Sequence, residues 1–129
     1  MSINRVVAPI NLDMCESVKA RFKLWLEKDG RPLLGEGGAR LLRLIEETGS
    51  LSEAARRMGV SYTFAWNYIR KREKLLGAKL IESSRGGVHG GETMLTGEAR
   101  RLLRLYAELH RAVERAVEEF CEKHREEGE

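Results

Sequence analysis

Residues 49–76 read GSLSEAARRMGVSYTFAWNYIRKREKLL and decide the fold of this chain. Ser50 and Glu53 stand three residues apart before an apolar-periodic run. This is the spacing of a capping box, in which each side chain satisfies a backbone N–H of the other residue. The run ends at Gly59, because glycine readily takes the positive φ of a helix C-terminus. Ser61 can then cap a second helix. The stretch therefore predicts two helices joined by a tight turn.

The second helix is basic and aromatic, whereas the first is short and rich in small residues. The buried stripe of the second helix is predicted at Ala65, Ile69 and Leu76, and Gly77 would end this helix. The polar positions that lie mostly off this stripe are Tyr62, Thr63, Asn67, Arg70, Lys71 and Lys74. The pattern is typical of a helix-turn-helix, whose second helix enters the major groove of DNA. An ordinary helical hairpin with a solvated basic face would show the same sequence pattern. The rest of the chain must therefore distinguish the two interpretations.

Charge is unevenly placed along the 129 residues, although the formal net charge is only +3. From Arg56 to Gly91 there are eight Lys or Arg residues and two acids, a net of +6. From Ala107 to Glu129 four basic residues stand against eight Glu, a net of −4. A basic centre around a helix-turn-helix pattern favours nucleic acid as a partner.

The chain has the length of one domain and no apolar run that could span a membrane or act as a signal peptide. We therefore expect a cytoplasmic protein without a membrane partner. Cys15 and Cys121 are too few to imply a disulfide framework. The absence of Gln and the abundance of Glu and Arg fit a thermophilic source.

The N-terminal part is predicted to contain a hairpin. Residues 1–16 lack periodicity and are expected to form a flexible arm. Residues 18–28 alternate between apolar and polar, which predicts a half-buried strand. Asp29-Gly30 is a hairpin turn signal, and residues 31–34 would form the return strand.

Glycines at 35–38 predict a loop, and residues 39–48 predict the first core helix, closed by Gly49. After the second helix of the helix-turn-helix, residues 79–83 and 92–95 are expected to pair as a wing.

The wing tip, residues 84–91, is rich in glycine and can approach DNA closely. Arg85 and His89 in this tip could lie along the backbone or minor groove. A nucleotide-binding loop is excluded, because no Lys-Ser/Thr pair and no helix follow the glycines directly.

A long helix is predicted from Thr96, its cap, to about Lys123. Its apolar residues follow a heptad spacing: Leu102, Tyr106, Leu109, Val113, Ala116 and Phe120. A helix of about 28 residues is about 40 Å long. This is more than a small body can cover, so we expect a homodimer built on this seam.

The predicted fold class is mainly α with small β hairpins: a winged helix-turn-helix with an N-terminal β-hairpin and a long C-terminal dimerisation helix. The expected organisation is a flexible arm at 1–16, the DNA-binding domain at 17–95, and the dimerisation helix with an acidic tail at 96–129.

The segment from Leu51 to Glu82 resembles the winged helix-turn-helix of LysR-type and ModE-type transcription regulators. Ser61-Tyr62 followed by Ala65-Trp66, the glycine pairs of the wing, and Leu95-Thr96 are most similar to the molybdate-responsive ModE type. The resemblance covers roughly residues 19–109. It implies a dimer that binds operator DNA, with the long helix in the interface.

Two features depart from this family. The oxyanion-binding domain has no counterpart in the chain, so molybdate sensing is not carried over. Arg72 stands where such helices usually bury Met or Leu. It either lays its stem on the core, or the helix packs differently there.

We expect Tyr62, Thr63, Asn67 and Arg70 to face the groove, since Asn can bond adenine and Arg guanine. Lys71, Lys74 and Arg85 would hold phosphates, and Trp66 would pack between helices.

Cys121 and His124 are three residues apart, and two copies would supply a two-Cys, two-His set. They lie off the heptad seam, so we predict no metal and no cofactor. No acid–base or nucleophile constellation is visible, which argues against an enzyme.

Three functions remain open from the sequence. The first is a dimeric, sequence-specific transcription regulator that binds double-stranded DNA. The second is an architectural DNA-binding protein. The third is an interaction module that docks a separate sensor protein.

Overall fold

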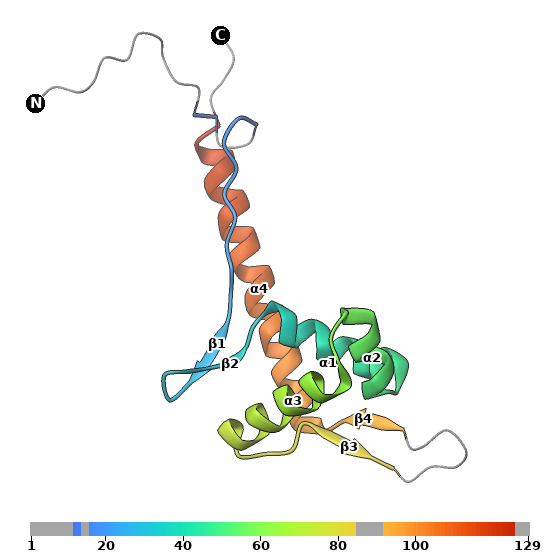
Figure 1. Cartoon of the computed structure of the whole chain (residues 1–129). Helices are drawn as coiled ribbons and strands as arrows, with labels where there is room; N and C mark the ends of the chain where they lie inside the picture. The colour runs from blue at the N-terminus through green and yellow to red at the C-terminus, as the bar shows by residue number, and fades with distance from the viewer. Residues whose placement is uncertain (1–11, 14–15, 85–91, 126–129) are drawn as a thin grey trace, which may run out of the picture. The chain divides into compact units, whose positions relative to one another are not determined.

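The computed structural model describes residues 12–13, 16–84 and 92–125 (Figure 1). Its elements are β1 (Leu26–Lys28), β2 (Arg31–Leu34), α1 (Glu36–Thr48), α2 (Leu51–Met58), α3 (Tyr62–Leu76), β3 (Ile81–Ser83), β4 (Thr93–Leu95) and α4 (Gly97–Lys123). The predicted fold class, mainly helical with two small hairpins and a long C-terminal helix, is confirmed. The predicted arm lies almost entirely outside the described residues, and none of the helices described is long and apolar enough to cross a membrane.

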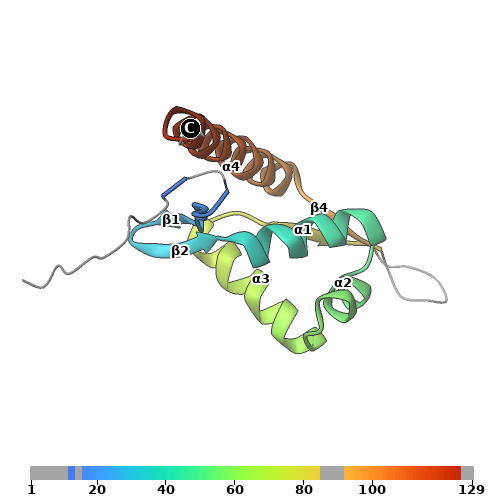
Figure 2. The ribbon, with the colours of Figure 1, turned by 90° about the horizontal axis from the view of Figure 1, so that it is seen from above.

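Contacts divide the chain into two compact units. One runs from Lys23 to His110, and the other combines the residues up to Phe22 with those from Arg111 onward. In the first unit, α1, α2 and α3 form a three-helix group. The hairpins β1–β2 and β3–β4 lie at opposite ends of this group in both views (Figures 1 and 2).

Small residues lie where the helices of the first unit approach one another. Ala39, Ala54 and Ala65 have no exposed surface, and each belongs to a different helix of the group. Leucine and isoleucine fill the rest of the core. The largest fully buried side chains are Leu34, Leu42, Ile45, Ile69 and Leu80.

Local capping sets the helix ends that the sequence predicted. The Ser50 hydroxyl accepts the Glu53 N–H at 2.9 Å, and the Ser61 hydroxyl accepts the Phe64 N–H at 3.0 Å. Three glycines end the core helices with φ between 71° and 81°: Gly49, Gly59 and Gly77. These bonds satisfy backbone groups that have no partner within their helices.

The reciprocal half of the predicted capping box is wrong. The Ser50 N–H donates to the hydroxyl of Thr48 at 3.1 Å, not to the Glu53 carboxylate. Glu53 instead accepts hydrogen bonds from Arg56 and Arg57 on the same helix. Two charged partners one turn away hold the carboxylate better than a single neutral N–H.

The predicted strand over 18–28 is also wrong for most of its length, because only Leu26–Lys28 pairs. The partner strand β2 has four residues and α1 follows it at once, so the residues before Leu26 have no strand to pair with. The turn is as predicted, with positive φ at Asp29 and Gly30. The register shifts opposite Leu33, and both Leu33 and Leu34 are buried.

Residues 35–38 are not the loop that their glycines suggested. Gly35 is the N-cap of α1, and Gly37 and Gly38 lie in its first turn. A Cβ at Gly38 would lie 1.9 Å from the Tyr68 hydroxyl oxygen. Glycine is therefore present here because the Tyr68 side chain of α3 reaches the backbone of α1 at this position.

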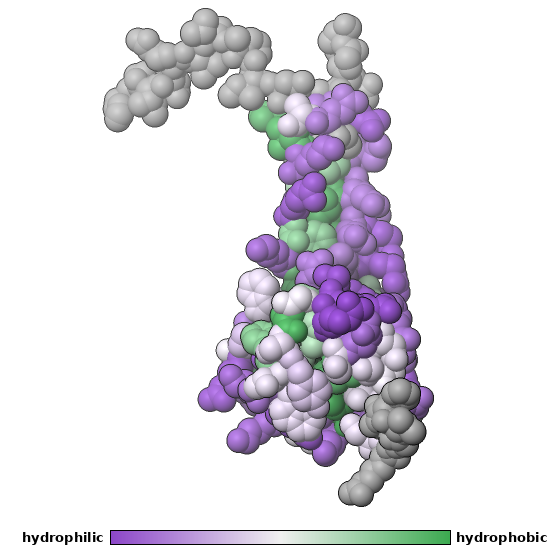
Figure 3. Space-filling model, turned by 45° about the vertical axis from the view of Figure 1, so that its right-hand side comes forward, coloured by the Kyte–Doolittle hydropathy of each residue, from purple (hydrophilic) through white to green (hydrophobic). Residues whose placement is uncertain are grey.

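Helix α4 begins after Thr96, whose hydroxyl accepts the Ala99 N–H at 3.1 Å. Leu102 and Tyr106, placed on the dimer seam by the sequence, are buried by the chain itself, and the Tyr106 hydroxyl donates to the Leu24 carbonyl. Leu109 and Phe120 remain exposed. Figure 3 shows apolar surface bordered by polar side chains along the part of the chain that holds the second half of α4.

Substitution of Gly38 by Ala should destabilise the protein. The new methyl would meet Tyr68 and, at 2.9 Å, the buried side chain of Leu34. Overpacking of this kind costs about 1–3 kcal/mol. Urea unfolding of Gly38→Ala would measure the loss.

Gly37→Ala is the matched control, because nothing lies within 4 Å of its added Cβ. It should be neutral or stabilising by up to about 1 kcal/mol, the usual gain of Ala over Gly in a helix. Equal unfolding midpoints for the two variants would contradict the close contact.

Candidate nucleic-acid interface

Helix α3 turns one side to the core, where half-buried side chains flank a fully buried stripe. Only Ala65, Ile69 and Glu73 are buried among its 15 residues. Leu76, predicted on this stripe, is half-buried. The exposed residues Thr63, Asn67 and Lys74 lie on the side of the helix away from Ala65 and Ile69, and this side is available to a partner.

The predicted contact residues of α3 lie on its outer side. Those that are exposed are Tyr62, Thr63, Asn67, Lys71 and Lys74, and Arg70 is half-buried. The structure thus brings the α3 members of the predicted set together on one helix. Arg85 and His89 lie outside the described residues.

Aromatic and cationic side chains form a column along one edge of this face. The rings of Tyr62 and Trp66 are stacked, with centroids 6.4 Å apart and planes 12° from parallel. The Arg70 guanidinium carbon lies 4.1 Å from the centroid of the Trp66 ring, within the range of a cation–π contact. Trp66 is half-buried and packs against the core, so it supports Arg70 from one side.

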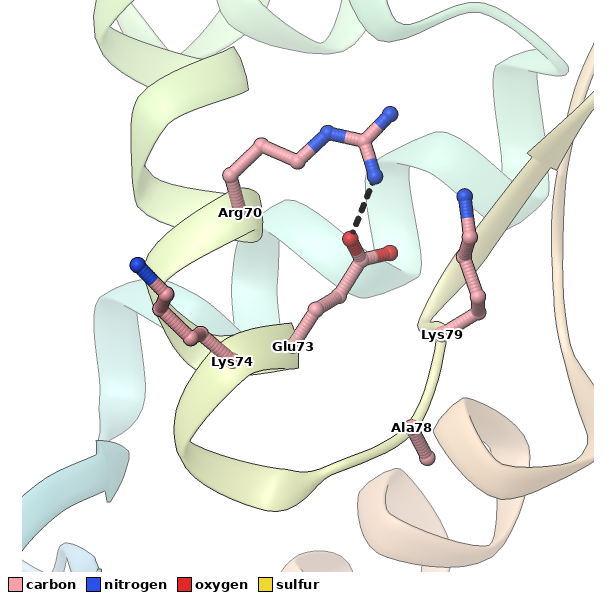
Figure 4. A pocket seen from close by; sticks show the side chains of 5 residues that line it. All are labelled: Arg70, Glu73, Lys74, Ala78 and Lys79. Carbon is pink, nitrogen blue, oxygen red and sulfur yellow. Dashed lines mark hydrogen bonds and ion pairs between the residues drawn. The ribbon is translucent and has the colours of Figure 1, made fainter.

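Glu73 holds Arg70 from another side and was missed by the sequence analysis. Arg70 Nη1 donates to Glu73 Oε1 at 2.7 Å, and the two side chains turn toward each other (Figure 4). The other carboxylate oxygen of Glu73 accepts the N–H groups of Leu80 and Ile81 at 2.8 and 3.3 Å. An acid three residues after Arg70 was visible in the sequence, but its bond to the start of β3 was not.

An open hollow lies between the end of α3 and the segment that leads into β3 (Figure 4). Arg70, Lys74 and Lys79 line it, together with Glu73 and Ala78. Three cations against one acid, which is already paired, make this hollow positive. Lys79 is a cationic lining residue that the sequence analysis did not assign to the interface.

Arg72 lies on the opposite side of α3. Its guanidinium carbon is 3.8 Å from the centroid of the Tyr68 ring, and its Nε donates to the Leu33 carbonyl at 3.4 Å. Of the two alternatives left open, the first holds, since the side chain lays its stem on the core and keeps its charge at the edge. Burial raises the pKa of the neighbouring Tyr68 hydroxyl.

Among the described residues of a single chain, Cys121 and His124 do not belong to a larger group of possible metal ligands. Within 12–13, 16–84 and 92–125, no three His, Cys, Asp or Glu side chains are grouped so that they could hold a metal ion. The His124 ring instead stacks on Phe120, with centroids 4.1 Å apart.

A short second helix, a glycine turn, an exposed third helix and a following hairpin together define a winged helix-turn-helix. Residues 38–100 match the family described as "Bacterial regulatory helix-turn-helix protein, lysR family". Residues 38–100 therefore form a LysR-family helix-turn-helix domain, and that family is described as one of regulatory proteins.

The predicted resemblance to ModE-type proteins is confirmed by the curated relatives. The chain is 43% identical over 77 residues to "Transcriptional regulator ModE" of Haemophilus influenzae, covering 60% of this chain and 30% of that protein. It is 35% identical over 95 residues to "Molybdenum-pterin-binding protein MopB" of Rhodobacter capsulatus, covering 74% and 35%. The chain thus spans about a third of the length of these relatives.

Among solved structures, the crystal structure of ArgP from Mycobacterium tuberculosis is similar over 66% of this chain and 30% of that chain. The TM-score is 0.48 and the sequence identity is 25%.

The ion pairs of Glu53 should be visible in a pH titration. Hydrogen bonds from Arg56 and then Arg57 lower the pKa of Glu53 from 4.5 to about 2. Because the pKa is lower in the folded state, these bonds stabilise the fold fully above pH 4.5. Their contribution is lost as the pH falls toward 2. Carboxyl NMR of the folded protein would follow this titration directly.

Arg56→Gln should raise the pKa of Glu53 toward 4.5, since Arg56 is the larger cause of the shift. Arg100→Gln is the matched control, because Arg100 pairs with Glu46 and not with Glu53. An unchanged Glu53 titration in Arg56→Gln would rule out the ion pair in solution.

Proposed function

We propose that this chain is a transcription regulator that binds a specific DNA operator as a homodimer. The carrying observation is the exposed outer face of α3 in a LysR-family helix-turn-helix domain, with three cations around its C-terminal half. In this proposal α3 enters the major groove, and the hairpin β3–β4 approaches the backbone or minor groove.

Base contacts are proposed for Tyr62, Thr63, Asn67 and Arg70, which lie in the first two-thirds of α3. Their support is position, since the N-terminal part of a recognition helix reaches base edges in this motif. Lys71, Lys74 and Arg85 are proposed to contact phosphates, and His89 is proposed to contact the backbone or minor groove. To these we add Lys79, which lines the same hollow as Lys74.

The decisive experiment is selection from a random library of duplexes by the purified chain. We expect an enriched motif made of two half-sites, one or more helical turns apart. Equal retention of all duplexes would favour an architectural DNA-binding protein. No retention at moderate salt would favour an interaction module that docks a separate sensor protein.

Phosphate contacts can be tested by salt dependence. Lys74→Gln should lower the slope of log affinity against log salt by about 0.9, the value for one phosphate contact. The selected motif should stay the same, because phosphate contacts carry no sequence information directly.

Arg43→Gln removes one exposed charge from α1 and is the control. It should leave the slope unchanged. Equal slopes for Lys74→Gln and the wild-type chain would remove Lys74 from the interface.

The homodimer is proposed to form through α4. Leu102 and Tyr106 serve the chain's own core, and Val113 is half-buried. The seam proposed for a second copy is therefore built on the exposed residues Leu109, Ala116 and Phe120, with Leu105 beside them.

Leu109→Glu should split the dimer, because it places a charge in the middle of this seam. Sedimentation should report monomers, while circular dichroism should keep its helical signal, since Leu109 is 42% exposed in the single chain. Arg104→Glu introduces the same side chain at an exposed position on another face of α4 and should leave the dimer intact. A dimeric Leu109→Glu protein would contradict this seam.

A further inference from the structure

The Glu73 carboxylate is buried, and both of its oxygens are used. The residue is 8% exposed. Oε1 accepts from Arg70, and Oε2 accepts from the Leu80 and Ile81 N–H groups. A carboxylate leaves water only where charged or hydrogen-bonding partners replace the water. Both oxygens are satisfied in the observed arrangement, and Arg70 is the charged partner in it.

Arg70 is consequently held on two sides. Its guanidinium carbon lies over the Trp66 ring, and Nη1 donates a hydrogen bond to Glu73. Nε and Nη2 are not used by either of these contacts. Together Nε and Nη2 form an edge of the guanidinium that can offer two parallel donors to a base or a phosphate.

We propose that Glu73 is a positioning residue for DNA recognition. It fixes the Arg70 fork so that the Nε–Nη2 edge meets one base pair in the major groove. This rests on the proposed function, because it requires that α3 enters the groove. The hydrogen bonds from the Leu80 and Ile81 N–H groups fix the same carboxylate at the start of β3. The partner that positions Arg70 is therefore itself held in place.

Glu73→Gln separates this role from a purely structural one. The amide oxygen can still accept the Leu80 N–H, whereas the negative charge that holds Arg70 is gone. We expect the selected motif to lose about tenfold in preference at one base pair, as expected for one bidentate Arg–guanine contact. Arg70→Ala should lose preference at the same base pair.

The double variant should lose no more than Arg70→Ala alone, because Glu73 acts through Arg70. Glu82→Gln is the matched control. It removes one acid from an exposed position of β3 and so changes the net charge equally, but the acid that pairs with Arg70 is Glu73. It should leave the preference at every position unchanged.

Three results would overturn the proposal. They are an unchanged motif in Glu73→Gln, a loss of affinity that is equal on all sequences, and a further loss in the double variant. A wild-type chain that selects no motif would instead refute the proposed function, so the two failures are distinguishable.

A measurement on the wild-type chain keeps the test valid if Glu73→Gln does not fold. NMR of the Arg70 side chain should show slow rotation of the guanidinium, with resolved signals from its terminal nitrogens. A freely rotating Arg70 would overturn the proposal without any variant.

Discussion

The close crossing of the core helices is the constraint on which the rest of the structure depends. It is possible because Ala54 of α2 and Ala65 of α3 expose nothing, and because Gly38 of α1 leaves room for Tyr68. Interiors are packed nearly as densely as organic crystals, so small residues at a crossing bring the helix backbones together. The crossing buries the side of α3 that holds Ala65 and Ile69, and the opposite side remains exposed to a partner.

Local features of this fold could be predicted from the sequence because they arise within three or four residues. The Ser50 and Ser61 caps, the terminal glycines of the helices and the Asp29-Gly30 turn are all of this kind. Their hydrogen bonds and φ values need no distant partner. They mark where each element begins and ends, and with the apolar periodicity they were sufficient to predict a helix-turn-helix followed by a hairpin.

Apart from the reciprocal half of the capping box, where near neighbours compete, the failures came where a distant residue decides the environment. Position 38 is a glycine because Tyr68 occupies the space of a Cβ, and Glu73 can be buried because the Leu80 and Ile81 N–H groups donate hydrogen bonds to it. Tyr106 had the heptad spacing of an interface residue but bonds to Leu24, 82 residues away along the chain. Periodicity identifies an apolar face, but it cannot distinguish a face that covers the chain's own core from one that meets a second copy.

The contrast between Arg70 and its lysine neighbours suggests a division of roles in the proposed complex. Arg70 is clamped between Trp66 and Glu73, so little of its conformational freedom remains to be lost on binding. A guanidinium that is held in one place suits discrimination between bases, because its two donors cannot move to bond a base whose acceptors lie elsewhere. Lys71 and Lys74 are exposed and carry compact charges on flexible stems, which suits phosphates at varied positions. Affinity that depends on salt would then come mainly from the lysines, and sequence preference from the arginine that the protein itself holds in place.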